Sequence, residues 1–411
     1  MQTDMNRIKT LIEQLAEYND TPGHGVSRFS YSPQDEKARA YITDLCKELG
    51  LEIRVDAVGN IFARLQGKDP SLPPIMTGSH IDSVKHGGKF DGMAGAVCSL
   101  EAVRVMVEGG YEPQCPIDLV FFAEEEGSNF KIPAFGSQLL AGILGIDDLK
   151  TITADNGLTA YELIRQAGYR PADLPQEVLK KGDVRAMIEL HIEQSVRLER
   201  EGVPIGIVSG IAGLRWFEVR FEGQANHAGA TPMHLRADPM AAASQVIAQV
   251  KHMAPKAGPT AVATVGKLDV LPNIANVIPS QVRFVVDIRD VQQSAIDQVS
   301  AQLKEAVEQA AADNGLSYEI IPVTSNDCIT IPAYLTKALE DSAKRLGLDY
   351  IFMPSGAVHD ASSLADICDV AMLFVPSIGG RSHVPEESTK YEDLKAGADV
   401  LLLTLLQLTA S

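Results

Sequence analysis

The sequence lacks a long apolar run, a basic tract and any paired cysteine motif. No stretch of about 18 apolar residues occurs, so no membrane span is expected. The net charge of −18 repels nucleic acid and anionic membrane surfaces, and neither is expected as a partner. The five cysteines are scattered and form no CxxC pair, which is typical of reduced thiols in a cytosolic protein. The charged segment 1–18 does not resemble a signal peptide, so a cytoplasmic location is predicted.

The composition indicates a folded chain that is large enough for two domains. It has 411 residues, of which 45% are hydrophobic and 22% are charged. Helix-like and strand-like runs alternate along the first 123 residues, which favours a layered α/β domain. The expected helices lie at 7–17, 33–49 and 92–108, and the expected strands at 51–55, 61–65, 75–78 and 117–123.

A different order of elements, β-α-β-β-α-β, occupies residues 213–322. Strands are expected at 215–221, 261–268, 277–289 and 317–322, with helices at 239–252 and 295–314. This order is typical of a ferredoxin-like domain. We therefore expect 213–322 to be an inserted lid and dimerisation domain, and 1–212 with 323–411 to form one discontinuous catalytic domain with a mixed sheet. A helix at 333–346, a strand at 370–375 and a helix at 394–408 would complete the catalytic domain.

Metal-type ligands follow the ends of several apolar strands, at the rim where open α/β sheets bind ligands. His80 and Asp82 are two residues apart and point the same way in extended chain, so the carboxylate can fix the imidazole ring. Asp91 precedes a helix beside Gly92, in a position to bridge two cations. The run Glu124–Glu126 places three carboxylates together, which repel one another unless cations neutralise them.

Two further segments carry ligands of the same kind. Alternation in the strand 188–193 puts Glu189, His191 and Glu193 on one face, and His383 follows the strand that ends at Val375. Each segment alone is weak evidence, because a lone histidine is usually structural and an acidic run is usually a solvated turn. Together they suit a pair of Zn²⁺ ions, with Mn²⁺ or Co²⁺ as alternatives. Two such ions about 3.5–4 Å apart, bridged by a carboxylate, form a hydrolytic centre.

The segments jointly resemble the M20 metallopeptidase-like superfamily over nearly the whole chain. Within it the sequence is most similar to the branch of N-carbamoyl-L-amino acid hydrolases, allantoate amidohydrolases and β-ureidopropionases. The stretches that carry the resemblance are 78–84, 124–128, 189–194, 226–233 and 355–361. His191 is informative, because many peptidase members have a carboxylate at that metal position. The sequence departs from the branch at Asn129, Ser195 and Val358, which bears on substrate identity and not on the metal ligands.

The resemblance implies a role for each matched residue. Five residues would hold the two ions: His80 and His191 one ion, Glu126 and His383 the other, with Asp91 between them. Glu125 would be the general base, and Asp82 would orient His80. The lid would supply His227 to steady the oxyanion, with Asn276 and Arg289 holding the substrate carboxylate. Gln194, Gly356 and His359 would line the pocket. On the residues alone, Asn276 could equally be a loop cap and Arg289 a surface ion pair.

The function implied by the resemblance is hydrolysis of the ureido C–N bond of N-carbamoyl-L-amino acids or allantoate, with release of ammonia and CO₂. The partner would be a small ureido acid. Two alternatives stay open: an N-acyl-amino acid hydrolase or dipeptidase with the same metal core, and a metal-dependent binding protein that has lost catalysis. The exposed sheet edge of the lid predicts a homodimer.

Overall fold

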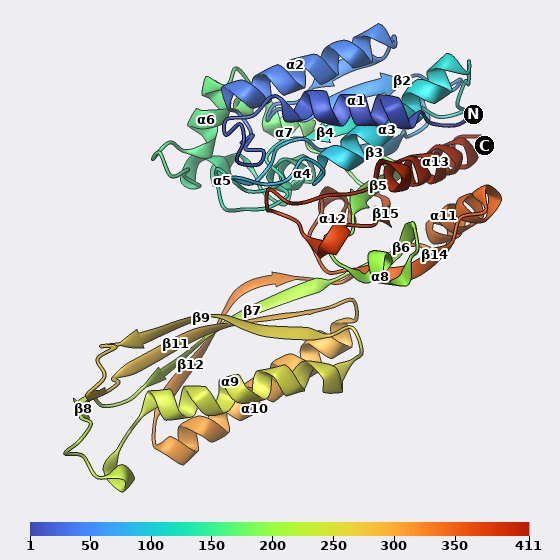
Figure 1. Cartoon of the computed structure of the whole chain (residues 1–411). Coiled ribbons are helices and arrows are strands. Elements are labelled where there is room, and N and C mark those ends of the chain that lie inside the picture. Colours follow the sequence, from blue (N-terminus) through green and yellow to red (C-terminus); the bar gives the residue numbers. More distant parts are fainter. Residues whose placement is uncertain (411) are drawn as a thin grey trace. The chain divides into compact units, whose positions relative to one another are not determined.

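The computed structural model describes residues 1–410, which divide into two compact units (Figure 1). Unit 1 contains Met1–Ser209, Ile331–Met353 and the chain from Val358 onward. Unit 2 contains Gly210–Thr330 and the short segment Pro354–Ala357. The division falls three residues before the boundary expected at 212/213 and eight residues after the one expected at 322/323, and the segment 354–357 of unit 2 was not expected.

A nine-stranded mixed sheet is the centre of the fold, in the order β1-β2-β4-β3-β5-β15-β6-β13, with β14 paired to β6. The strands β4, β3, β5 and β15 run parallel to one another. The strands β1, β2, β6 and β13 pair antiparallel with their neighbours in the sheet. The bounds are β1 Glu52–Val55, β2 Ile61–Leu65, β3 Ile75–His80, β4 Ile117–Phe122, β5 Ala186–Ile192, β6 Ile205–Ile211, β13 Ile329–Thr330, β14 Tyr350–Ser355 and β15 Asp369–Val375. The parallel strands are almost wholly buried, as expected for strands that are covered on both faces.

Helices of unit 1 cover the parallel strands on both faces. Leu190 of β5 contacts Gly397 of α13, whereas its neighbour Glu189 points to the other face and accepts a hydrogen bond from Ala361 of α12. The helices α1, α3, α11 and α13 pack against one another as a layer. The bounds are α1 Met5–Ala16, α2 Pro33–Glu48, α3 Met93–Glu108, α4 Phe135–Leu140, α5 Ile146–Thr151, α6 Ala160–Gln166, α7 Leu174–Glu177, α8 Arg197–Glu201, α11 Ala333–Leu346, α12 Asp360–Ser363 and α13 Tyr391–Leu408. None of the helices in residues 1–410 is long and apolar enough to cross a membrane.

Unit 2 has a four-stranded antiparallel sheet, in the order β12-β7-β11-β9, and two long helices. Apolar side chains from the sheet and both helices form one core, which includes Phe221, Phe284, Val246 and Leu303. The bounds are β7 Gly213–Glu222, β8 Asn226–His227, α9 Pro239–Ala257, β9 Val262–Leu271, β10 Val277–Ile278, β11 Gln281–Asp290, α10 Gln293–Asn314 and β12 Ser317–Asn326. Apart from the two-residue strands β8 and β10, the elements follow the order β-α-β-β-α-β expected from the sequence.

Two expected strands of unit 2 are wrong in extent, and a proline lies at each error. The run 277–289 is not one strand, since β10 pairs with β8 and β11 begins only after Pro279 and Ser280. The strand expected to end at Pro322 continues to Asn326, with a register shift between Pro322 and Thr324. Proline cannot donate to a ladder, but an edge strand such as β12 tolerates it at a bulge.

Candidate metal centre and active site

The predicted ligands of unit 1 meet at the carboxyl ends of the parallel strands. His80 is the last residue of β3, and Glu124–Glu126 directly follow β4. His191 lies near the end of β5, and the chain beyond β15 leads to His383. Since these strands run parallel, their carboxyl ends share one edge of the sheet. Residues far apart in sequence thus come together where sequence analysis expected them.

Asp91 is the centre of the cluster, because each of its two carboxylate oxygens faces a different group of ligands. Its Oδ1 lies 3.2 Å from His191 Nε2 and 3.7 Å from His80 Nε2. Its Oδ2 lies 3.3 Å from His383 Nε2, which is 3.4 Å from Glu126 Oε2. The ligand atoms of His80, Asp91 and His191 all lie within 4.8 Å of one another, as do those of Asp91, Glu126 and His383.

These separations fit two metal ions. Four ligands arranged tetrahedrally at about 2.0–2.1 Å from a zinc ion lie about 3.4 Å from one another. The separations of 3.2, 3.3 and 3.4 Å match that value, and 3.7 Å allows a slightly open angle. Glu126 Oε1 is buried and has no hydrogen-bond partner among residues 1–410, which a cation would remedy. The residues present therefore fit a pair of divalent ions bridged by Asp91.

The charges of the cluster also favour the binding of cations. Burial raises the pKa of Glu125 well above its usual range, and it raises the pKa of Glu126 to about 8, with the Asp91 charge adding to the effect. Burial opposes ionisation of Asp91 as well, but the imidazoles of His191, His383 and His80 hold its pKa well below its usual range. The hydrogen bond to Asp91 raises the pKa of His383 to about 9. Carboxylates packed at this density are stable as anions only beside cations.

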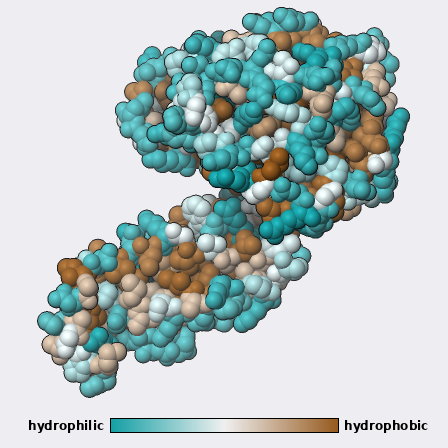
Figure 2. Space-filling view, viewed as in Figure 1, coloured by the Kyte–Doolittle hydropathy of each residue, from teal (hydrophilic) through white to brown (hydrophobic). Residues whose placement is uncertain are grey.

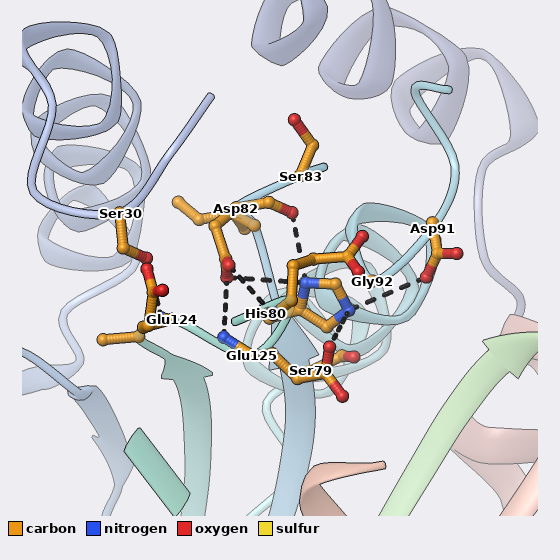
Figure 3. A network of polar contacts seen from close by, with 12 residues as sticks. Ser30, Ser79, His80, Asp82, Ser83, Asp91, Gly92, Glu124 and Glu125 are labelled. Carbon is orange, nitrogen blue, oxygen red and sulfur yellow. Dashed lines mark hydrogen bonds and ion pairs between the residues drawn. The ribbon is translucent and has the colours of Figure 1, made fainter. Parts of the chain in front are cut away.

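The ring of His80 is oriented by Asp82, two residues further along the chain, which contacts its Nδ1 side (Figure 3). Its Nδ1 lies 3.1 Å from the carbonyl oxygen of Asp82 and 3.5 Å from Asp82 Oδ1, which leaves Nε2 facing Asp91 and Glu125. The Asp82 carboxylate also accepts the backbone N–H groups of Glu125 and Glu126, at 3.3 and 3.2 Å. Asp82 therefore connects the loop after β3 to the loop after β4, in addition to its contact with His80.

Glu125 lies beside the first group of predicted ligands, which is formed by His80, Asp91 and His191. Its Oε2 is 3.6 Å from His80 Nε2, and the residue is only 7% exposed. Its neighbour Glu124 has a positive φ of 56°, an uncommon conformation for a residue other than glycine. His383 and Gln194 share this feature, with φ of 59° and 55°. Unusual backbone conformations thus occur at three positions around the cluster.

Gln194 and His359 were expected to line the pocket, and both lie against the metal ligands. Gln194 Nε2 donates to Asp91 Oδ2 at 2.8 Å. His359 is 2% exposed, and its ring packs edge-on against His191 with centroids 4.6 Å apart. Glu189, His191 and His359 form a further group of ligand atoms within 4.8 Å. Glu193, in contrast, faces away, since its carboxylate accepts the backbone N–H groups of Arg197 and Leu198 at α8.

Two of the predicted lid residues lie side by side in unit 2. His227 is the last residue of β8 and Asn276 directly precedes β10, and Ala228 N donates to the carbonyl of Asn276 at 3.0 Å. His227 Nδ1 accepts backbone N–H groups from Gly229 and Ala230, at 3.0 and 3.2 Å. The proton of the neutral ring is therefore on Nε2, which makes the exposed His227 a hydrogen-bond donor.

Arg289 and Gly356, the other two, are also together in unit 2. Arg289 Nη1 donates to the carbonyl of Gly356 at 3.0 Å. Its Nε and Nη2 bind the carboxylate of Asp287 at 3.0 and 2.9 Å. The guanidinium thus already makes a two-pronged carboxylate contact, the kind expected with a substrate.

Several contacts at the site were missed because they join segments that are distant in sequence. Glu387 accepts the backbone N–H groups of Phe90 and Asp91, and Ser382 Oγ is 2.5 Å from Asp91 Oδ2. No periodicity in the sequence indicates such pairs.

Asn129, singled out as a departure, donates through its backbone and side-chain nitrogens to the buried Glu124, at 2.6 and 2.7 Å. Its amide therefore serves the loop after β4.

Comparisons with known proteins identify the family of this chain. Residues 76–407 match the family model of peptidase family M20/M25/M40. The chain belongs to that family. It is 40% identical over 408 residues to an N-carbamoyl-L-amino acid amidohydrolase of Geobacillus stearothermophilus, an alignment that covers 98% of each chain. It is 34% identical over 403 residues to an allantoate amidohydrolase of Bacillus subtilis, covering 98% of this chain and 97% of the relative.

A solved structure shows the same architecture for an M20-family relative. The crystal structure of an amidase of the hydantoinase/carbamoylase family from Burkholderia multivorans superposes with a TM-score of 0.92 at 34% identity. The superposition covers 100% of this chain and 99% of that one. The mixed α/β fold with its large mixed sheet is therefore that of the M20-family amidohydrolases.

Proposed function

We propose that this M20-family protein is a dinuclear metal-dependent amidohydrolase that cleaves the ureido C–N bond of N-carbamoyl-L-amino acids or allantoate. The observation that carries the proposal is the placement of Asp91, whose two oxygens face two separate groups of metal-type ligands. The relatives that match over 97–98% of their lengths are named as amidohydrolases of these two substrates. His80 and His191 would hold one ion, Glu126 and His383 the other, and Asp91 both.

The proposed chemistry assigns a distinct task to each residue. Two divalent ions, when bound, would polarise the ureido carbonyl and lower the pKa of a water molecule. Glu125 would take a proton from that water as it attacks the ureido carbon, and then pass the proton to the leaving nitrogen as the C–N bond breaks. The carbamate left over would decompose to ammonia and CO₂. The raised pKa of Glu125, which comes from burial, suits a group that must accept and return a proton.

Unit 2 would act as a ferredoxin-like lid that supplies groups for the substrate. Its element order and the strand order β12-β7-β11-β9 support that assignment. His227, as an Nε2 donor, would stabilise the oxyanion, an effect of roughly 3–4 kcal/mol per donor. Asn276 and Arg289 would hold the substrate carboxylate, with Arg289 exchanging Asp287 for it, and Gly356 would position Arg289 through its carbonyl.

A substrate panel tests the proposed reaction. The protein, loaded with Zn²⁺, Mn²⁺ or Co²⁺, is assayed for ammonia release from N-carbamoyl-L-amino acids, allantoate and ureidoglycolate, and for cleavage of N-acetyl amino acids and dipeptides. Turnover confined to ureido acids is expected. Faster cleavage of N-acetyl amino acids or dipeptides would establish the alternative function, and no turnover of any substrate would favour a binding protein without catalysis.

The role of Glu125 is tested by Glu125→Gln, which keeps the size of the side chain and removes its basicity. We expect turnover to fall by about 10²–10⁴-fold, the usual contribution of a general base, with two ions per chain retained. Glu386→Gln is the matched control, because Glu386 is exposed and forms a surface ion pair with Arg381 at 3.1 Å. Equal turnover of both variants would remove Glu125 as the base.

Unit 2 also supports the proposal of a homodimer. Apolar side chains are exposed on its two edge strands, at Val262, Leu268 and Leu271 of β9 and at Ile321 and Val323 of β12. Figure 2 shows hydrophobic residues gathered on the face of this unit that is in view. Light scattering is expected to give twice the mass of the 44.2 kDa chain. A monomer at micromolar concentration would contradict it. The cytoplasmic location stays a prediction.

A further inference from the structure

Glu387 makes hydrogen bonds to two of the three loops that carry the second group of ligands (Asp91, Glu126 and His383), although it is not a predicted ligand itself. Its Oε1 accepts the backbone N–H groups of Phe90 and Asp91, each at 2.9 Å. Its Oε2 accepts the hydroxyl of Ser382 at 2.8 Å and the backbone N–H of His383 at 3.4 Å. The residue is 4% exposed. One carboxylate therefore joins the loop of the bridging Asp91 to the loop of His383.

The loop before Asp91 is shaped to admit this carboxylate. A Cβ atom at Gly88 would lie 2.1 Å from Glu387 Oε1 and 2.4 Å from its Cβ, so no other residue fits at 88 without moving Glu387. Ser382 Oγ extends the connection, since it is also 2.5 Å from Asp91 Oδ2. Gly88 on one loop thus leaves room for the Glu387 carboxylate, and Ser382 on the other loop donates a hydrogen bond to it.

The two groups of ligands differ in how firmly the fold holds them. His80 and His191 belong to β3 and β5, and each is held in the sheet by strand pairing, His80 opposite Phe122 of β4 and His191 opposite Phe374 of β15. His383 lies in a loop beyond β15, has a φ of 59° and has a side chain that is 50% exposed. Its position relative to Asp91 depends on contacts outside the sheet. Glu387 supplies those contacts directly.

We propose that Glu387 is a positioning residue that sets the distance between Asp91 and His383. Through that distance it determines how tightly the second ion is bound relative to the first. The proposal rests on the dinuclear centre proposed above. Partners behind metal ligands typically change metal affinity by about 10–100-fold when they are removed. Loss of Glu387 should therefore weaken the ion held by Asp91, Glu126 and His383, and change the ion held by His80, Asp91 and His191 much less.

The test measures metal binding alone, without turnover. Metal-free protein is titrated with Mn²⁺ by calorimetry, and bound metal is counted after dialysis. We expect two ions in the unaltered protein, and in Glu387→Ala a second ion bound about 10–100-fold more weakly with the first little changed. Gly88→Ala should reproduce this result, because its methyl group displaces Glu387 while leaving the carboxylate in the chain. Glu386→Ala, at the exposed neighbouring position, should bind both ions as the unaltered protein does.

Glu387→Gln separates hydrogen bonding from charge. The amide oxygen can accept the N–H groups of Phe90 and Asp91, and the amide nitrogen can donate to Ser382 Oγ, so that the hydroxyl proton is directed to Asp91. Of the four hydrogen bonds to Glu387, only the long one from His383 N–H, at 3.4 Å, loses its acceptor. The second ion should therefore be held almost as well as in the unaltered protein. If Glu387→Gln loses as much affinity as Glu387→Ala, the charge and not the hydrogen bonds carries the effect, and the positioning role is overturned.

Each remaining outcome also decides the question. If the unaltered protein binds fewer than two ions, the dinuclear centre is wrong and the role of Glu387 falls with it. If it binds two, and both Glu387→Ala and Gly88→Ala hold the second ion as tightly, only the role of Glu387 is wrong. Equal weakening of both ions would also overturn the selective role. Should Glu387→Ala fail to fold, Ser382→Ala carries the test, because it removes the hydroxyl shared by Glu387 and Asp91 and should weaken the second ion selectively.

Discussion

Gly92 offers a steric test of the first group of ligands, through the change Gly92→Ala. Gly92 precedes α3 with a φ of 63°, and a Cβ there would lie 2.3 Å from Cε1 and Nε2 of His80. Ordinary contact begins at 3.4 Å, so moving the ring from 2.3 Å to 3.4 Å requires a shift of about 1.1 Å. A misplacement of about 1 Å at a site can cost ~100-fold in rate, equivalent to ~2.7 kcal/mol of transition-state stabilisation.

Gly110→Ala is the matched control for the backbone effect. Gly110 follows the same helix with a φ of 65°, and a Cβ there would meet nothing within 4 Å. Both variants place alanine at a positive φ, which costs about 1–3 kcal/mol of folding free energy for a residue other than glycine. Only Gly92→Ala also displaces a metal ligand.

The assay compares kcat/KM on the best ureido substrate, bound metal after gel filtration, and urea unfolding. Gly92→Ala should lose at least ~100-fold in kcat/KM and part of its metal, while Gly110→Ala loses only stability. If Gly92→Ala keeps the activity and metal content of Gly110→Ala, His80 is not a ligand whose placement matters, and the reasoning fails.

Two further predictions follow from the charges and hydrogen bonds of the site. With the pKa of His383 raised to about 9 and that of Glu126 to about 8, protons compete with the second ion below these values. Its affinity should therefore rise with pH between about 6 and 8, by about tenfold per unit for each proton displaced, in Mn²⁺ titrations at fixed ionic strength; an affinity independent of pH would contradict it. Asn129→Ala removes the amide that donates to the buried Glu124, and should lower the free energy of unfolding in urea by about 1–3 kcal/mol with both ions retained; unchanged stability would show that the amide is dispensable.

The cluster of metal-type side chains could be predicted because its members lie at or just after the ends of apolar strands. His80 is the last residue of one buried strand and Glu126 follows another within a few residues, and parallel strands bring such ends to one edge of a sheet. The helix cap at Ser32 is equally local, since its side chain accepts the backbone N–H of Asp35.

What could not be predicted depends on contacts between distant segments or on very short elements. Glu387 and Phe90 are 297 residues apart, and no pattern in either segment indicates the other. The helices α4 to α7 have four to seven residues each, too few to show a helical period. Pro322 suggested the end of a strand, because only the position of β12 at the edge of the sheet makes a bulge possible there.

Anomalous X-ray diffraction from crystals grown with Zn²⁺ tests the dinuclear centre most directly. The account predicts two peaks about 3.5–4 Å apart, on either side of the Asp91 carboxylate. One peak should lie against His80 and His191, and the other against Glu126 and His383. A single peak, or peaks away from Asp91, would contradict it.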